Sequence, residues 1–304
     1  MAGMEVGGAV LGGATFHPDF EQAHTAATNA VRIQTIYQDE HVHVVSDQPI
    51  DPAKGKLLSE RIETAYKWDQ KQQHWANKDV LNSPLTVAVL SRPMFSALTG
   101  DMTGSVAGVT TGPNLFVMPD AVMDRKSAMD DQTIAHELGH VQDFREGGER
   151  LKEVPIYLQE GKEYVLGEKY PLSEHLPNPH IQYVAKTLGE ITGRDAQRVM
   201  DHFRVAADEA NSGNFGFMGE TTGALFVEYL RTRLGGKGVA DAVPRVAQTI
   251  TQVGNGASYD EAFTRQFGVS PKTAERDFVT FIAATEGNPQ ARLGGTLFGK
   301  KPSA

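Results

Sequence analysis

One short segment of this 304-residue chain carries the residues best suited to chemistry, His136-Glu137-Leu138-Gly139-His140. In a helix, positions 136 and 140 project from nearly the same face, so their two imidazoles can bind one metal ion together. Glu137 would lie beside that ion and could take a proton from a water that the metal makes acidic. The segment therefore predicts a catalytic zinc centre on a helix, with Glu137 as its general base.

The residues around this segment favour a helix over positions 130–145. Asp130 or Asp131 can cap its first turn, and Gly147-Gly148 can end its last turn. At about 100° per residue, the apolar side chains fall on the side opposite the histidines. These apolar residues are Ile134, Leu138 and Val141. We therefore expect one face of the helix to enter the core and the other face to carry the site.

Two histidines do not complete a catalytic zinc site, which normally has three protein ligands and leaves a fourth position for water. The chain has no cysteine, so the third ligand must be another histidine or a carboxylate. Asp143 is on the same helix face as the histidines. In a continuous helix it lies beside them, which suits a hydrogen-bonding role behind a ligand better than a ligand role.

Glu160 is the better candidate for the third ligand. Pro155 suits the first turn of a new helix, and that helix can fold back along the histidine helix after a connection at residues 149–154. Glu160, on the inner face of that helix, would then meet both histidines. The neighbouring Gly161 costs about 1 kcal/mol of helix stability relative to alanine, and a close approach between two helix backbones would explain it.

The first half of the chain mixes strands and helices. Apolar alternation predicts strands at residues 31–37 and 41–45 that can pair as a hairpin, and helical spacing predicts a helix at residues 51–75. Leu85–Leu90 is a short apolar strand, and residues 105–118 form a further extended pair.

From about residue 130 onward the periodicity is helical. The predicted helices span residues 130–145, 155–166, 180–188, 195–210, 221–234, 239–253, 259–267 and 271–284. A sheet-bearing half followed by a helical half, with the histidine helix at the junction, is an α+β arrangement. We expect one domain over residues 29–286, divided into a sheet-bearing half at 29–146 and a helical half at 147–286. A flexible leader at 1–28 and a loose tail at 287–304 would flank it.

The overall composition excludes some classes of protein. A formal net charge of −9 argues against a general nucleic-acid-binding protein, which normally has a basic surface. No stretch approaches the roughly 18 uninterrupted apolar residues of a membrane span, so we expect a soluble protein. The first residues lack the basic segment and the clear cleavage site of a signal peptide. The compartment stays open between the cytoplasm and export by a route without a signal peptide.

The histidine segment and the residues that follow it resemble a known family. HELGH and then PIYLQEGKEY are similar to the gluzincin peptidases of the peptidase MA-like group, which have HExxH and, about twenty residues later, P-x-x-L-x-E-G-x-x-x-Y. The resemblance extends upstream to PLTVAVLSRPMFSALTG and SVAGVTTGPNLFVMPD, and downstream to TTGALFVEYLRTRLGG and FGVSPKTAERDFVTFI. It covers residues 30–286. It implies a zincin-like fold, one zinc ion held by His136, His140 and Glu160, and Glu137 as the general base.

One segment departs from the family pattern. Where related aminopeptidases open a Y-E-K-G segment with a tyrosine that helps to stabilise the oxyanion, this chain has Glu220-Thr221-Thr222-Gly223. The carboxylate of Glu220 cannot donate a hydrogen bond to an oxyanion unless it is protonated. Other side chains could supply that donor, namely Tyr164, Tyr183, Tyr229 and His202. The chain also lacks a G-x-M-E-N segment for gripping a free amino terminus, which favours an endopeptidase over an aminopeptidase.

These features predict a zinc metallopeptidase that hydrolyses peptide bonds in a peptide or protein substrate. By analogy, the strand near residues 106–116 could present a free edge along which the substrate lies extended. Two alternatives belong to other classes. One is a zinc-binding pseudo-enzyme or scaffold that recognises a partner without cleaving it, against which the intact Glu137 argues. The other is a zinc hydrolase that acts on a different amide or an ester.

Overall fold

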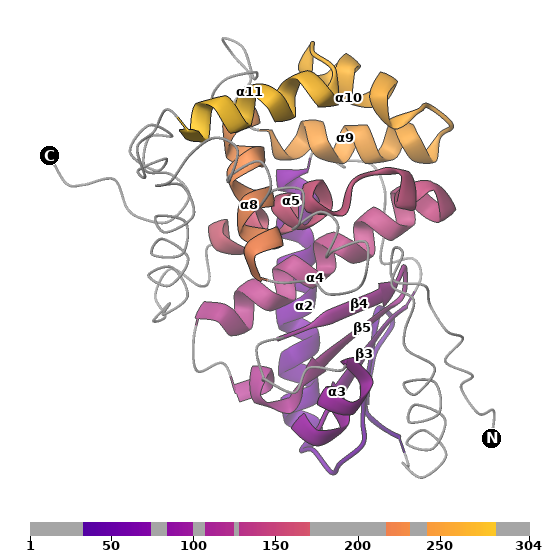
Figure 1. The fold of residues 1–304 in the computed structure, drawn as a ribbon. Helices are drawn as coiled ribbons and strands as arrows, with labels where there is room; N and C mark the ends of the chain where they lie inside the picture. Colours follow the sequence, from indigo (N-terminus) through magenta and orange to yellow (C-terminus); the bar gives the residue numbers. More distant parts are fainter. Residues whose placement is uncertain are drawn as a thin grey trace, which may run out of the picture.

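The computed structural model describes residues 33–73, 84–99, 107–124, 128–170, 217–231 and 242–283 of the 304-residue chain. These residues have an α+β fold, as the sequence predicts, with a five-stranded mixed sheet followed by a group of helices. In Figure 1 the sheet lies in the lower half of the molecule and the later helices lie in the upper half. The histidine helix lies between them, so it can contact both halves.

The sheet contains both antiparallel and parallel strands. They are β1 (Gln34–Gln38), β2 (Val42–Ser46), β3 (Leu85–Leu90), β4 (Val109–Gly112) and β5 (Leu115–Pro119), in the spatial order β1-β2-β3-β5-β4. β1 pairs antiparallel with β2, and β4 pairs antiparallel with β5, whereas β3 is parallel to both of its neighbours. The predicted hairpin and the predicted extended pair are therefore confirmed, and β4 forms one edge of the sheet.

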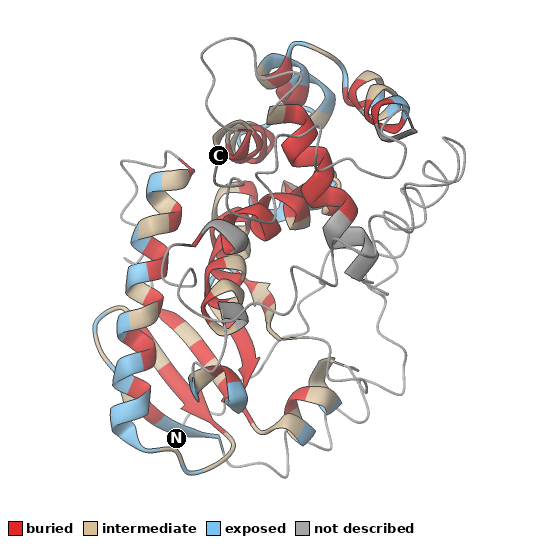
Figure 2. Ribbon diagram, turned by 90° about the vertical axis from the view of Figure 1, so that its left-hand side faces the viewer, coloured by how far each residue is buried: buried red, intermediate tan, exposed pale blue. Residues whose placement is uncertain are grey.

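Helices cover both faces of the sheet. One face shares a core with α2 (Pro52–Gln72), which confirms the helix predicted at residues 51–75. The opposite face packs on Phe95 of α3 (Arg92–Thr99). Asp51 caps the start of α2 by accepting a hydrogen bond from the Ala53 backbone N–H. α2 runs along the sheet with one side buried (Figure 2).

The histidine helix is α4 (Ala128–Gly147), which begins before the predicted start at residue 130. Asp130 and Asp131 therefore lie in the first turn of the helix and not before it. The carboxylate of Asp131 accepts hydrogen bonds from Arg61 of α2 at 3.0 and 2.9 Å, and this ion pair joins the first turns of α4 to α2. The predicted end is confirmed, because α4 stops at Gly147 and Gly148 has a φ of +53°, which glycine adopts without strain.

The apolar face predicted for α4 is confirmed. It contributes to the core that α2 and α4 share with one face of the sheet, through side chains that are 1% exposed or less, namely Ile134, Leu138 and Val141. The core face of α4 is thereby fixed against the sheet, and the opposite face is turned toward the helical half.

The helical half has its own core. It begins with a 3₁₀ turn, η3 (Gly148–Glu153), and continues with α5 (Ile156–Lys169), α8 (Phe217–Tyr229), α9 (Val243–Gly254), α10 (Tyr259–Phe267) and α11 (Pro271–Ala283). The buried apolar side chains of these helices form one cluster, visible in Figure 2 as the red sides that the upper helices turn toward one another. α5 packs on both α4 and α8, so it links this core to the histidine helix.

Some predictions concern parts of the chain outside the described residues. They are the helices at 180–188 and 195–210, the leader at 1–28 and the tail at 287–304. Within the described ranges, no helix is long and apolar enough to cross a membrane.

Gly161 of α5 lies against Gly223 of α8. A Cβ on Gly161 would come within 2.2 Å of the Gly223 carbonyl carbon, and a Cβ on Gly223 would come within 2.1 Å of the Tyr157 carbonyl oxygen. No side chain fits at either position, so the two backbones are in direct contact. The presence of Gly161 in the sequence predicted this close approach between two helix backbones. The contact also fixes the position of the adjacent Glu160.

Replacing Gly161 by alanine is expected to lower the free energy of unfolding by roughly 1–3 kcal/mol, because the new Cβ would push α5 and α8 apart. Urea unfolding followed by circular dichroism would measure the change. Lys272→Ala, at an exposed position of α11, is the control and should stay within about 0.5 kcal/mol of the wild type. A Gly161→Ala protein as stable as the wild type would contradict the close approach.

Candidate metal centre

The packing of α5 on α4 brings together the three residues that the sequence predicts as zinc ligands. Oε2 of Glu160 lies 3.2 Å from Nε2 of His136 and 3.1 Å from Nε2 of His140, and the two Nε2 atoms are 3.1 Å apart. The three side chains are between 12% and 18% exposed. The donor atoms thus form a small triangle of side chains that are mostly buried.

The size of this triangle fits a zinc ion. Zinc takes His nitrogen and carboxylate oxygen at about 2.0–2.2 Å, and ligands at the corners of a tetrahedron would then lie roughly 3.3–3.5 Å from one another. The observed separations of 3.1 to 3.2 Å are close to that edge length. Two imidazoles and one carboxylate are also a donor set that catalytic zinc sites use, with the fourth position left for water.

The charges of the three groups are coupled. Burial lowers the pKa of His140, but the nearby carboxylates of Glu160, Glu163 and Glu137 together outweigh it and raise that pKa to about 10. Burial alone would raise the pKa of Glu160, yet the two histidines hold it well below its usual range. The carboxylate is therefore ionised, and its negative charge would also favour a divalent cation bound by the three groups.

Glu137 lies on α4 next to the triangle and is 5% exposed. Its Oε2 accepts a 2.6 Å hydrogen bond from the hydroxyl of Thr110, on the edge strand β4. Burial raises the pKa of Glu137, while the positive charges of His136 and His140 and the Thr110 hydrogen bond oppose that rise. The geometry places a buried carboxylate with a raised pKa beside the candidate metal centre, as a proton-transfer group requires.

Two further carboxylates lie behind His140. Asp143 of α4 and Glu163 of α5 each place an oxygen within 4.8 Å of the other and of a ring nitrogen of His140. Both are fully buried. Gly139 makes room for Glu163, because a Cβ there would come within 1.7 Å of Glu163 Oε2. The predicted place of Asp143, beside the histidines and behind a ligand, agrees with this position.

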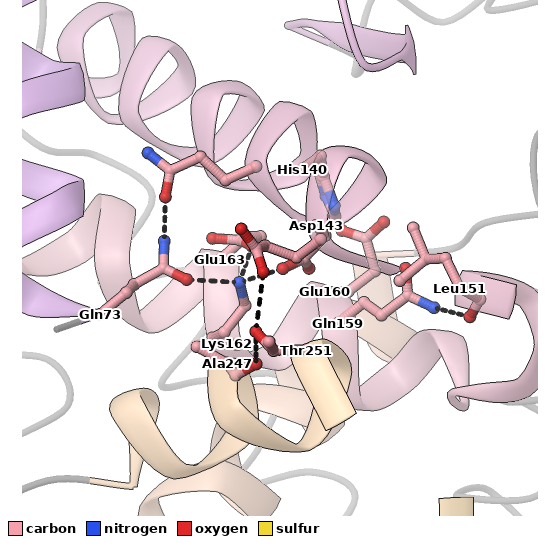
Figure 3. A network of polar contacts seen from close by, with 12 residues as sticks. Gln73, His140, Asp143, Leu151, Gln159, Glu160, Lys162, Glu163, Ala247 and Thr251 are labelled. Carbon is pink, nitrogen blue, oxygen red and sulfur yellow. Dashed lines mark hydrogen bonds and ion pairs between the residues drawn. The ribbon is translucent and has the colours of Figure 1, made fainter. Parts of the chain in front are cut away.

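The cation that balances these carboxylates is Lys162, whose side chain is fully buried between α2, α4 and α5 (Figure 3). Its ammonium lies 2.6 Å from Asp143 Oδ1, 2.5 Å from Glu163 Oε1 and 2.9 Å from Gln73 Oε1. Burial lowers the pKa of Lys162, but the two carboxylates outweigh it and raise that pKa. Gln73 in turn donates to Gln142 of α4 at 3.0 Å, which links the end of α2 to the network.

This network contains more acidic groups than Lys162 can balance. Burial and the nearby Asp143 raise the pKa of Glu163 to about 8, although Lys162 acts in the opposite direction. Asp69 of α2 is also fully buried, neither of its carboxylate oxygens has a hydrogen-bond partner, and burial together with the charge of Glu163 raises its pKa well above the usual value. Part of this acidic network is therefore protonated near neutral pH.

The four predicted oxyanion donors and Glu220 differ in whether the structure describes their side chains and where it places them. Tyr164 and Tyr229 are buried in the core of the helical half, and the Tyr229 ring packs on Phe278 and Phe281. Tyr183 and His202 lie outside the described residues. Glu220 belongs to α8, but its side chain is outside the described part.

Three residues at the site were not predicted from the sequence. Nothing in the local pattern singles out Lys162 and Glu163, because charged residues on a helix ordinarily face water. Their burial is a feature of the tertiary structure, in which the described residues of α5 from Tyr157 to Gly167 are nearly all buried. Thr110 had no local signal, since it meets Glu137 across 27 residues of sequence.

Comparison of the chain with known protein families, with curated proteins and with solved structures finds no match. The inference of function therefore depends on the site itself.

Replacing Glu160 by alanine is expected to weaken zinc binding by at least about 100-fold, because loss of a direct ligand should cost no less than the 10- to 100-fold loss that follows removal of a supporting group. Competition with a chromogenic chelator would measure the affinity, with one zinc bound per wild-type chain. Glu149→Ala, at an exposed position of η3, is the control and should bind like the wild type. Undiminished affinity in Glu160→Ala would exclude Glu160 as a ligand.

Replacing Lys162 by methionine is expected to lower the free energy of unfolding by about 3–5 kcal/mol, because Asp143 and Glu163 would lose the buried cation between them. Urea unfolding at neutral pH would measure the loss. Lys152→Met, at an exposed position of η3, is the control and should be nearly neutral. Adding Glu163→Gln to the Lys162→Met protein should restore part of the stability, and no restoration would contradict the charge balance described here.

Proposed function

We propose that this chain is a zinc-dependent metallopeptidase with a zincin-like fold, acting as an endopeptidase on peptide or protein substrates. The observation that carries the proposal is the triangle formed by His136, His140 and Glu160 with the buried carboxylate of Glu137 next to it. The α+β fold, with the histidine helix between a mixed sheet and a helical half, supports it.

Each residue has a distinct task in this proposal. His136, His140 and Glu160 would hold one zinc ion, which would supply Lewis acidity and make a nearby water easier to deprotonate. Glu137 receives a proton at its carboxylate and returns it to the leaving nitrogen as the peptide bond breaks. Asp143 and Glu163 each have an oxygen within 4.8 Å of a ring nitrogen of His140, so they contribute negative charge behind this proposed ligand.

The position of β4 supports an extended peptide as the substrate. β4 is the edge strand of the sheet, and within the described residues it pairs only with β5. Its other edge therefore offers backbone N–H and C=O groups to a peptide that adds as a further strand. Thr110 on this strand contacts Glu137, so a peptide bound along β4 would run close to the proposed base.

Replacing Glu137 by glutamine is expected to lower the rate of peptide hydrolysis by about 10²- to 10⁴-fold while zinc remains bound, because the amide keeps the size of the side chain but cannot take up the proton. Cleavage of a fluorogenic peptide library by zinc-loaded protein would measure the rate, and metal analysis would measure the zinc. Glu149→Gln, an exposed change of the same chemistry, is the control.

The same experiment separates the proposal from its alternatives. A zinc-loaded wild type that cleaves no peptide in the library would contradict the peptidase proposal. Retained zinc without cleavage of any peptide, amide or ester would favour the scaffold. Cleavage of amides or esters alone, lost in Glu137→Gln, would favour a hydrolase of another substrate class.

A further inference from the structure

The carboxylate of Glu137 lies against the edge strand β4 and the residue before it. Thr110 donates its hydroxyl proton to Oε2 at 2.6 Å, and both residues are 5% exposed. Gly108 packs on the same carboxylate, because a Cβ there would come within 2.7 Å of Oε1 and 2.8 Å of Cγ. Thr110 therefore holds one oxygen, and the lack of a side chain at Gly108 makes room for the other.

The Thr110 hydroxyl has two possible acceptors, the carboxylate and the backbone carbonyl of Glu137, and the carboxylate is the closer one. The hydroxyl oxygen also lies 2.9 Å from the backbone carbonyl of Glu137, but a hydroxyl has one proton to donate. The carboxylate oxygen is the closer acceptor, at 2.6 Å against 2.9 Å, which favours the bond to Oε2. Among the described residues, Thr110 is the donor that fixes the Glu137 carboxylate.

The strand is itself held firmly against α4. The pairing of β4 with β5 is irregular between Thr110 and Gly112, and such bulges redirect a side chain. At the tip of this hairpin, Arg145 of α4 donates to the Pro113 carbonyl at 2.6 Å and to Asn114 Oδ1 at 2.8 Å. The hairpin is thus bound to α4 near its tip as well as at Thr110, so the Thr110 hydroxyl has a defined position relative to α4.

We propose that Thr110 is a positioning residue for the general base, which holds Glu137 through Oε2 so that Oε1, in the space left open by Gly108, exchanges the proton. This inference rests on the proposed peptidase function, and it adds that one strand both aligns the substrate and orients the base. A peptide bound along β4 would contact the backbone of Thr110, the residue whose side chain bonds Glu137.

Kinetics of zinc-loaded variants test the role of the hydroxyl. Thr110→Val keeps the shape but removes the donor, and it should lower kcat by about 10- to 100-fold with KM and zinc affinity near the wild-type values. Thr110→Ser keeps the donor and should recover most of kcat. Thr280→Val is the matched control, since Thr280 is exposed on α11 and donates its hydroxyl to the Arg276 carbonyl of the same helix, and it should leave kcat unchanged. Equal losses in Thr110→Val and Thr280→Val, or no rescue by serine, would overturn the proposal.

A structural measurement tests the same point without activity. In crystal structures of the metal-free proteins, the Glu137 carboxylate should keep its position in the wild type and in Thr110→Ser, and should turn to another rotamer in Thr110→Val. Gly108→Ala should displace the same carboxylate by direct contact while Thr110 remains intact, and should lower kcat as Thr110→Val does. An unmoved Glu137 in both Thr110→Val and Gly108→Ala would overturn the proposal.

The proposed peptidase function and the proposed role of Thr110 can be refuted independently. If the wild type cleaves no peptide, the proposed function fails, and the position of Glu137 in the variants still decides whether Thr110 holds it. If the wild type is active and Glu137→Gln abolishes cleavage, but Thr110→Val has the wild-type kcat, the function stands and the role of Thr110 is refuted.

Discussion

The contact between α4 and α5 is the interaction on which the rest of the site depends, because it buries several charged side chains where little water can reach them. An ionised group taken out of water costs several kcal/mol unless a partner of opposite charge and enough hydrogen bonds replace the water. Here Glu160 faces two imidazoles, and Lys162 faces Asp143 and Glu163. Glu160 and Lys162 of α5 each have partners on α4, so a rotation or slide of one helix against the other would separate charges.

Glycines decide how closely these elements approach. Gly161 lets the backbone of α5 touch α8, and Gly139 lets the Glu163 carboxylate lie against α4. Gly108 leaves space beside the Glu137 carboxylate. At Gly139 and Gly108 a Cβ would occupy the volume of a carboxylate at the site, and at Gly161 it would overlap the backbone of Gly223. The pattern explains why residues that weaken helices and strands occur at the centre of the molecule.

The arrangement also couples the candidate metal centre to both cores. α4 packs Ile134, Leu138 and Val141 into the core beneath the sheet, and α5 adds Leu158 and Val165 to the core of the helical half. The donor triangle lies where these two helices face each other. Its shape therefore depends on two separate apolar cores and on the buried ion pairs that join them, in addition to the residues that form it.

Much of the fold and part of the candidate site could be predicted from the sequence, because these features depend on local spacing. Period-two alternation predicted the strands, and helical periodicity predicted α2, α4 and α5. The four-residue spacing of His136 and His140 is a property of one helix, so the pairing of the imidazoles followed from it. Glu160 was accessible to prediction because a short connection and Pro155 return the chain beside α4. The predicted start of α4 was wrong by two residues, because the helix begins at Ala128. Asp131 pairs instead with Arg61 of α2, a helix distant in the sequence.

What only the tertiary structure decided are the relations between residues far apart in the chain. Thr110 meets Glu137 because β4 is the edge strand that lies next to α4, and no local pattern in either segment encodes that neighbour. Lys162 and Glu163 are internal because α2, α4 and α8 close around α5, although charged residues on a helix ordinarily face water. The sequence by itself determined which residues share a helix face. Tertiary packing determined which faces meet, and with that the environment that sets the charge of each group.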